Sequence, residues 1–111
     1  MRIDYDGRRF RPVGAAAVDG VVARYRQDGD LLRGEYSGGD ARQGTLVGTC
    51  APDGTLRFAY CHVGVGGAIV CGSCVSTPDL LTDGRVRLRE QWVRYGEHAE
   101  QGVSWLEELA A

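Results

Sequence analysis

Two polar side chains with acid–base chemistry interrupt the apolar faces of two predicted strands. Glu90 lies two residues before Trp92 in the alternating run 85–95, and His62 shares the apolar face of the run 56–63. Because burial removes the hydration of a carboxylate and disfavours its charged form, we expect a raised pKa for Glu90 unless a cation or several donors hold it. Such a carboxylate can act as a general acid or base, or hold a polar group of a ligand.

The same two residues also admit a purely structural interpretation. Glu90 could pair with Arg94, His62 or backbone amides inside the core, because structural ion pairs perturb pKa values as active sites do. A lone histidine on such a face is more often a core or rim residue than a catalytic one. Three tyrosines and both tryptophans are expected on the same inner surface and would line a ligand there: Tyr25, Tyr36, Tyr60, Trp92 and Trp105.

Four cysteines raise the question of a metal site or disulfides. They are Cys50, Cys61, Cys71 and Cys74, and they contain a single Cys-x-x-Cys pair. An offset of three residues on a strand points the two thiols of that pair to opposite faces unless a bulge at Gly72 intervenes. A cytoplasmic location also argues against disulfides. We therefore expect small buried thiols and no metal, with metal or redox use as the alternative.

The elements that must position these residues are short strands. Between residues 21 and 108, alternating runs are each closed by Gly, Asp-Gly or Gly-Gly, with no helical period between them. Two-residue turns with positive φ need such residues, so this spacing predicts an antiparallel meander. The expected strands cover about 9–13, 21–27, 30–37, 43–50, 56–63, 68–76, 85–95 and 102–109, with a loop at 14–20 and Pro78 as the end of the sixth strand.

A meander of about eight strands in so short a chain must close on itself or expose its edges. The sequence therefore predicts an all-β, up-and-down barrel of calycin-like architecture that forms one domain, residues 1–111. Eight strands make a barrel just wide enough to be filled by side chains or to hold one small ligand. On the last strand, we expect Val103 and Trp105 to face inward. Leu106 on the same strand and Val93 on the run 85–95 are expected to face outward. With the apolar C-terminus, they would suit a modest homodimer patch.

Composition and charge exclude several classes of function. The net charge is −2, and the expected outward stripe of Arg85, Arg87 and Arg89 has no interleaved aromatic residues, which argues against nucleic acid. The chain has no lysine, so Schiff-base chemistry is excluded. Its glycine-rich stretches open no helix as a phosphate loop would, so no cofactor is expected. No apolar run is long enough for a membrane span or a signal core, so we expect a cytoplasmic protein without membrane association.

Several motifs resemble a set of small uncharacterised bacterial proteins. They are Gly34-Glu35-Tyr36-Ser37-Gly38-Gly39, Gly44-x-Leu46-x-Gly48, Leu56-x-Phe58-x-Tyr60-x-His62 and Asp83-Gly84-Arg85-x-Arg87-Leu88-x-Glu90-x-Trp92. The resemblance runs from about residue 3 to residue 108, and members of this set often carry the label N-acetylglutamate synthase. An acetyltransferase that uses acetyl-CoA normally needs a pyrophosphate loop that opens a helix, and the sequence predicts neither. The resemblance implies a shared barrel with His62, Glu90 and Trp92 as recurring inner residues, without an established activity.

Three functions stay open at this point. The first is a small-molecule binding module in which the aromatic residues form apolar walls and Glu90 and His62 fix a polar group. The second is a cofactor-free isomerase or cyclase of a biosynthetic pathway, with Glu90 or His62 moving a proton inside a dry cavity. The third is a protein-interaction or accessory subunit with a filled barrel that uses its outer surface.

Overall fold

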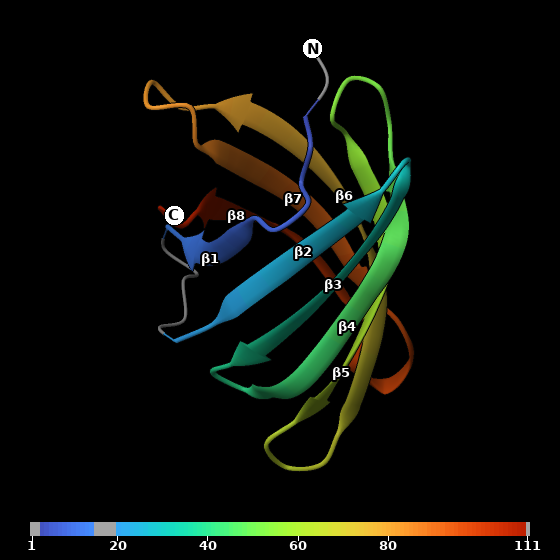
Figure 1. Ribbon diagram of the computed structural model, residues 1–111. Helices are drawn as coiled ribbons and strands as arrows, with labels where there is room; N and C mark the ends of the chain where they lie inside the picture. Colours follow the sequence, from blue (N-terminus) through green and yellow to red (C-terminus); the bar gives the residue numbers. More distant parts are fainter. Residues whose placement is uncertain (1–2, 15–19, 111) are drawn as a thin grey trace.

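The computed structural model describes residues 3–14 and 20–110, and they form an antiparallel barrel (Figure 1). Its strands follow one another in sequence order, and β1 pairs with β8 to close the ring. The strands are β1 (Arg9–Val13), β2 (Val22–Asp28), β3 (Leu31–Gly38), β4 (Ala41–Cys50), β5 (Leu56–Gly64), β6 (Ile69–Leu80), β7 (Val86–Arg94) and β8 (Glu100–Glu108), with a 3-10 turn, η1 (Gly96–His98), before β8. The predicted meander of eight strands and its closure are confirmed.

Glycines in the turns set the positions at which the strands end. Gly54 and Gly84, in the β4–β5 and β6–β7 connections, have φ of +87° and +86°, a region that favours glycine. The aspartate before each glycine accepts a backbone hydrogen bond two residues further on, at 2.9 Å for Asp53 and 3.1 Å for Asp83. The Asp-Gly signal therefore marks these turns for a physical reason.

Pro78 does not end the sixth strand, which corrects the sequence prediction. Strand β6 continues to Leu80, and Pro78 lies opposite Leu88 of β7. The last residue of β6 that pairs with β5 is Ser76, so beyond it β6 has a ladder on one side only. A proline is tolerated in such an edge segment because its missing N–H breaks no bond on the open side. Residues 15–19 of the expected loop at 14–20 lie outside the described residues.

One end of the barrel is closed by the N-terminal segment and an aromatic cluster. Tyr5, Phe10 and Tyr25 are almost completely buried, and the Phe10 and Tyr25 ring centroids lie 4.8 Å apart. The Tyr5 hydroxyl donates a hydrogen bond of 2.7 Å to the carbonyl of Gly54, across 49 residues of sequence. This bond attaches the segment before β1 to the β4–β5 turn and closes the barrel at that end.

The inward and outward faces of β8 are the reverse of the prediction. Leu106, expected outside, is 9% exposed and lies opposite Leu88, whereas Val103, expected inside, is 48% exposed. Trp105 also lies outside, where the Arg87 guanidinium stacks 4.6 Å from its ring centroid. Both faces of this strand carry large apolar residues, so alternation alone does not decide its orientation. The orientation of β8 follows from its pairing with β7, whose buried and more exposed residues alternate.

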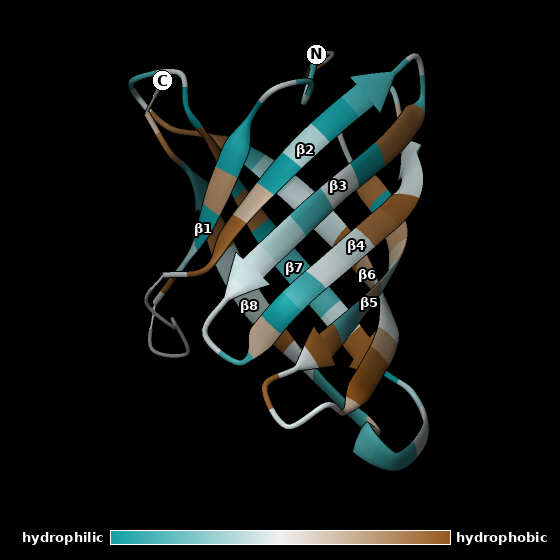
Figure 2. Cartoon of the chain, turned by 60° about the horizontal axis from the view of Figure 1, so that its bottom comes forward, coloured by the Kyte–Doolittle hydropathy of each residue, from teal (hydrophilic) through white to brown (hydrophobic). Residues whose placement is uncertain are grey.

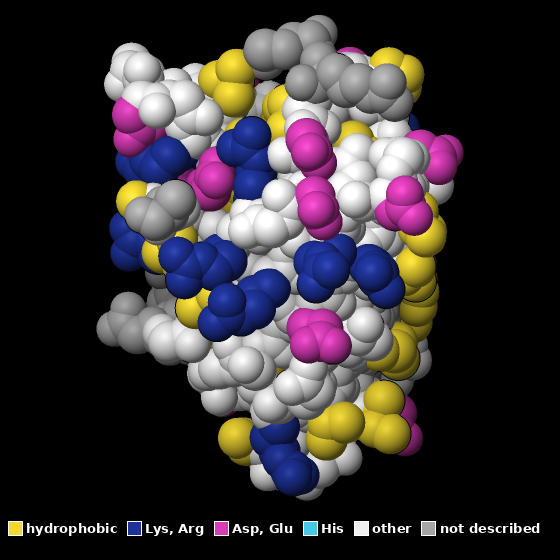
Figure 3. Space-filling view, in the orientation of Figure 1, with side chains coloured by type: hydrophobic (Ala, Val, Ile, Leu, Met, Phe, Trp, Pro, Cys, Tyr) yellow, Lys and Arg dark blue, Asp and Glu magenta, His cyan; other side chains and the backbone are white. Residues whose placement is uncertain are grey.

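Charged side chains are numerous on the outer surface of the barrel. Figure 2 shows hydropathy changing along the strands, and Figure 3 shows arginine and acidic side chains over the side on which β2 and β3 lie in front. Of the predicted arginine stripe, Arg85 pairs with Asp83 at 2.7 Å and Arg87 lies 3.9 Å from Glu107. No helix among the described residues is long and apolar enough to cross a membrane.

Candidate functional site

The barrel encloses a cavity of about 320 Å³. Six of the seven residues predicted to line a ligand site line it, namely Tyr25, Tyr36, Tyr60, His62, Glu90 and Trp92, together with Pro12, Val21, Ala23, Leu46, Phe58, Cys74, Arg94, Ser104 and Leu106. Trp105 is the exception, because β8 turns its side chain to the outer surface. The lumen is therefore open, aromatic and largely apolar, with a few polar groups at different depths.

Glu90 lies deep in this lumen, next to small polar side chains. In the ladder it is opposite Ser76 on β6 and Ser104 on β8. The Ser76 hydroxyl donates to its carboxylate at 3.3 Å, and the Cys74 thiol does so at 3.6 Å. Among the described residues, no hydrogen bond or ion pair joins Glu90 to Arg94, to His62 or to a backbone amide, so the pairings considered for a purely structural role are not formed.

Burial raises the pKa of Glu90 from 4.5 to about 7, and the hydrogen bonds from Cys74 and Ser76 offset only part of that rise. The expectation of a raised pKa is confirmed, because the two side chains that donate to Glu90 are uncharged and do not offset its burial in full. Burial raises the pKa of the Cys74 thiol, and the neighbouring Glu90 carboxylate raises it further. Near neutral pH, Glu90 can thus accept a proton or hydrogen bond from a ligand, or return one.

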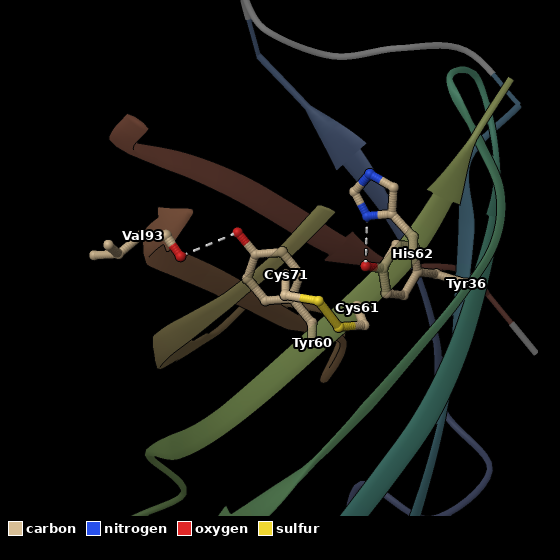
Figure 4. Close-up of a disulfide and its surroundings, with 6 residues drawn as sticks. All are labelled: Tyr36, Tyr60, Cys61, His62, Cys71 and Val93. Atoms are coloured by element: carbon tan, nitrogen blue, oxygen red, sulfur yellow. Dashed lines mark hydrogen bonds between the residues drawn. A yellow bond between two sulfur atoms is a disulfide. The ribbon is translucent and has the colours of Figure 1, made fainter. Parts of the chain in front are cut away.

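His62 lies at another level of the lumen and pairs with Tyr36. Its Nδ1 is 2.8 Å from the Tyr36 hydroxyl, and its ring lies nearly parallel to that of Tyr60 at a centroid separation of 6.5 Å (Figure 4). Burial and the positive charge of Arg94 lower the pKa of His62, which favours the neutral imidazole. On β6 the partners of His62 and Glu90 are Val70 and Ser76, about 20 Å apart at the rise of an antiparallel strand. The two residues are therefore not partners of each other.

Glycines on neighbouring strands make room for the lumen aromatics. A Cβ added at Gly102 would lie 2.6 Å from the Trp92 ring, and one at Gly72 would lie 2.6 Å from the Tyr60 hydroxyl. A Cβ at Gly44 would also collide with the Tyr36 ring. Each of these aromatic side chains thus packs against the wall over a residue without a side chain.

Arg94 is a lumen residue that was not predicted as part of the site. It follows Glu90 and Trp92 on the same face of β7, and its guanidinium lies 5.3 Å from the Trp92 ring centroid. The signal was available, because residues four apart on a strand share a face. The sequence pattern suggested this arginine only as a structural partner of Glu90.

A disulfide between Cys61 and Cys71 corrects the expectation of buried free thiols for these two residues. They lie directly opposite each other on β5 and β6, with 4.2 Å between their Cα atoms, and Figure 4 shows the bond beside Tyr60. Hairpin pairing across the turn at 64–67 would have placed them together. Cys74 faces the lumen and Cys71 does not, as their spacing predicted. Cys50 and Cys74 are buried outside the disulfide. In the part of the chain that is described, no group of three or more His, Cys, Asp or Glu residues is placed to hold a metal ion.

An eight-stranded antiparallel barrel, closed at one end and lined by aromatic rings around an open lumen, defines a calycin-like barrel fold. The model of the family described as "Avidin-like protein" matches residues 3–109, so the chain belongs to this family. No curated protein matches the chain. The family match supports the expected calycin-like barrel, and it does not address the label N-acetylglutamate synthase.

Proposed function

We propose that the barrel binds a small apolar or aromatic molecule in its lumen, with Glu90 and His62 as polar contacts. The observation that carries this proposal is the cavity of about 320 Å³, lined by aromatic rings and a few convergent polar groups. Ligand sites have volumes of roughly 300–1,000 Å³ and this kind of lining. Membership of the avidin-like family supports the proposal, because such barrels bind small ligands such as biotin.

The two polar residues contact different parts of the ligand. Glu90 accepts a hydrogen bond from a donor group that enters deeply, and His62 offers its ring nitrogens at a separate level beside Tyr36. The apolar body of the ligand packs between the rings of Tyr60 and Trp92, which lie against the wall. Offset or edge-on contacts with these rings contribute beyond the area they bury.

A single-tryptophan variant tests lumen binding directly. Trp105→Phe removes the outer tryptophan and leaves Trp92, which lines the cavity, as the sole fluorophore of its kind. Titration with biotin first, then with small aromatic compounds, should change its emission saturably for at least one compound. Trp92→Phe, which keeps Trp105, is the matched control and should respond to none. A panel without any saturable change in the Trp92 signal would contradict the proposal.

The role of Glu90 has its own test. Glu90→Gln keeps the size of the side chain but removes the carboxylate, so the affinity for a ligand identified in that titration should fall about tenfold or more, as expected for a lost charge-assisted hydrogen bond. Circular dichroism should show that the barrel remains folded. An unchanged affinity would remove Glu90 as a ligand contact, while leaving binding in the lumen intact.

Acid–base catalysis is a second candidate, favoured by the pKa of about 7 at Glu90. A general acid or base works best when its pKa lies near the working pH. Mass spectrometry and NMR of a bound compound after prolonged incubation would detect an isomerised or cyclised product. Recovery of every bound compound unchanged would leave a binding protein and no enzyme. The alternative of a subunit with a filled barrel is disfavoured by the open lumen.

We propose that the protein forms a homodimer through the outer face of β6–β8. A depression there is lined by residues of which none is charged: the outward-facing Ser73, Val75, Gln91, Val93, Gln101 and Val103, with Cys74, Trp92 and Gly102 between them along the strands. Val93 and Val103 are 40% and 48% exposed. An uncharged, partly apolar face is self-compatible, because no like charges meet across a two-fold axis. Light scattering should give twice the chain mass, and Val93→Arg should give the monomer mass. A monomeric wild-type chain would contradict the proposal.

We also retain the cytoplasm as the proposed compartment, and the disulfide offers a test. Reducing systems of the cytoplasm keep cysteines as thiols, whereas oxidising compartments preserve such bonds. Rapid alkylation of cells that make the protein should therefore trap Cys61 and Cys71 as thiols, even though the two are joined in the structure. Recovery of both as a disulfide would place the protein in an oxidising compartment.

A further inference from the structure

We propose that Arg94 is an anion-binding subsite of the lumen and that the ligand is a bipolar molecule. One end donates a hydrogen bond to Glu90, the middle is flat and apolar beside Trp92, and the other end carries a carboxylate-like anion at Arg94. This inference rests on the proposed binding of a small molecule in the lumen and specifies its chemistry.

Arg94 is placed and oriented to serve such a ligand. It is partly buried, lines the same cavity as Glu90 and Trp92, and extends from the same face of β7. Its guanidinium lies 5.3 Å from the Trp92 ring centroid, which restrains a long side chain that would otherwise be mobile. The guanidinium also interacts with the Tyr60 side chain. Held in this way, it presents its remaining N–H groups in a fixed plane, the geometry that matches a carboxylate.

Within the described part of the chain, no carboxylate forms an ion pair with Arg94. Arg8, Arg26, Arg85 and Arg87 each have a carboxylate oxygen within ion-pair distance. Arg94 has none among the described residues, and Glu100, opposite it on β8, does not form an ion pair with it.

The field of this charge reaches the groups around it. It lowers the pKa of His62, and it opposes the rise that burial causes in the pKa values of Tyr36 and Tyr60. A partly buried cation without a counter-ion is costly unless a partner is supplied. An anionic group of the ligand would be that partner.

The spacing of the two charged residues sets the length of the ligand. Glu90 and Arg94 are four residues apart on one strand, about 13 Å at the usual rise per residue. Trp92 lies midway and lines the space between them. An aromatic ring system or a ring with a short chain spans such a distance, with its N–H donor at one end and its anion at the other.

Two commercial probes differ in the anionic group alone and therefore test the subsite. 6-(p-Toluidino)-2-naphthalenesulfonate carries an arylamine N–H and a sulfonate at opposite ends of its naphthalene, and N-(p-tolyl)-2-naphthylamine has the same rings and N–H without the sulfonate. Each is titrated against the Trp105→Phe protein, with quenching of Trp92 as the signal. Arg94→Gln should weaken the sulfonate probe about tenfold or more, as for loss of a charge-assisted pair, and should change the neutral probe less than about twofold.

Further variants separate this proposal from the one on which it rests. Arg94→Lys keeps the charge and should recover part of the affinity for the sulfonate probe. Arg89→Gln, on the same strand but directed to the outer surface beside Thr77 and Trp105 in the ladder, should leave both affinities unchanged. Equal effects of Arg94→Gln on both probes, or none on either, would overturn the anion subsite while lumen binding stands. Failure of both probes to quench Trp92 would count against both proposals.

Discussion

The free energy of unfolding should depend on pH through Glu90, and Glu90→Gln should remove that dependence. Burial raises the pKa of this residue from 4.5 to about 7 in the folded protein. Between these two pH values the folded state keeps the proton and the unfolded state loses it. The stability associated with this proton is therefore fully present below pH 4.5 and is lost as pH rises to about 7. A difference of about 2.5 pKa units, at 1.36 kcal/mol per unit, corresponds to about 3 kcal/mol.

Urea unfolding followed by circular dichroism, at intervals from about pH 4 to 8.5, measures this effect. The variant minus wild-type difference in unfolding free energy should rise by about 3 kcal/mol across the series, because any cost of burying the new amide is independent of pH. Glu35→Gln, on the exposed outer face of β3, is the matched control for the loss of one carboxylate. Parallel pH profiles for wild type and Glu90→Gln would refute the reasoning.

Three further substitutions test the packing around the lumen. Gly102→Ala places a methyl 2.6 Å from the Trp92 ring, about 1 Å inside normal contact, so it should cost about 1–3 kcal/mol and weaken lumen binding. Cys61→Ser should lower stability by about 2–3 kcal/mol under oxidising conditions by releasing Cys71, and dithiothreitol should then have no further effect. Tyr5→Phe removes the 2.7 Å hydrogen bond to the β4–β5 turn and should cost about 1–3 kcal/mol in urea unfolding.

Two of these substitutions have a counterpart that should behave differently. Gly66→Ala meets nothing within 4 Å and should leave binding and stability unchanged, unlike Gly102→Ala. Tyr95→Phe removes an exposed hydrogen bond of 2.7 Å and should cost less than Tyr5→Phe. Equal losses within either pair would mean that the contacts in the lumen and at its closed end do not determine stability.

The fold was predictable because its turns carry an unambiguous chemical signal. Gly54 and Gly84 adopt a φ that few other residues tolerate, and strands connected by such short turns can only pair with their neighbours. The fold prediction failed at positions whose environment depends on how one strand is aligned with its neighbour. The edge position of Pro78 depends on where β5 begins, and the orientation of Trp105 depends on the pairing of β8 with β7.

The candidate site was predictable residue by residue but not pair by pair. Alternation placed Glu90 and His62 on inward faces, and burial alone gave the direction of the Glu90 pKa shift. The partners of these residues depend on register between strands, which alternation does not specify. For this reason the Tyr36–His62 hydrogen bond, the disulfide and the glycine beneath each ring were missed.

The energetics of Glu90 argue that the residue serves a ligand and not the fold. At neutral pH the buried carboxylate makes the barrel less stable by about 3 kcal/mol than a neutral group would, from its raised pKa. Apolar side chains fit the same surface, as Leu88 and Leu106 show by lying buried on β7 and β8. Folding alone would therefore be better served by one of them. A ligand that donates to Glu90 stabilises the ionised form, so the stability that the empty barrel lacks is regained when the lumen is occupied.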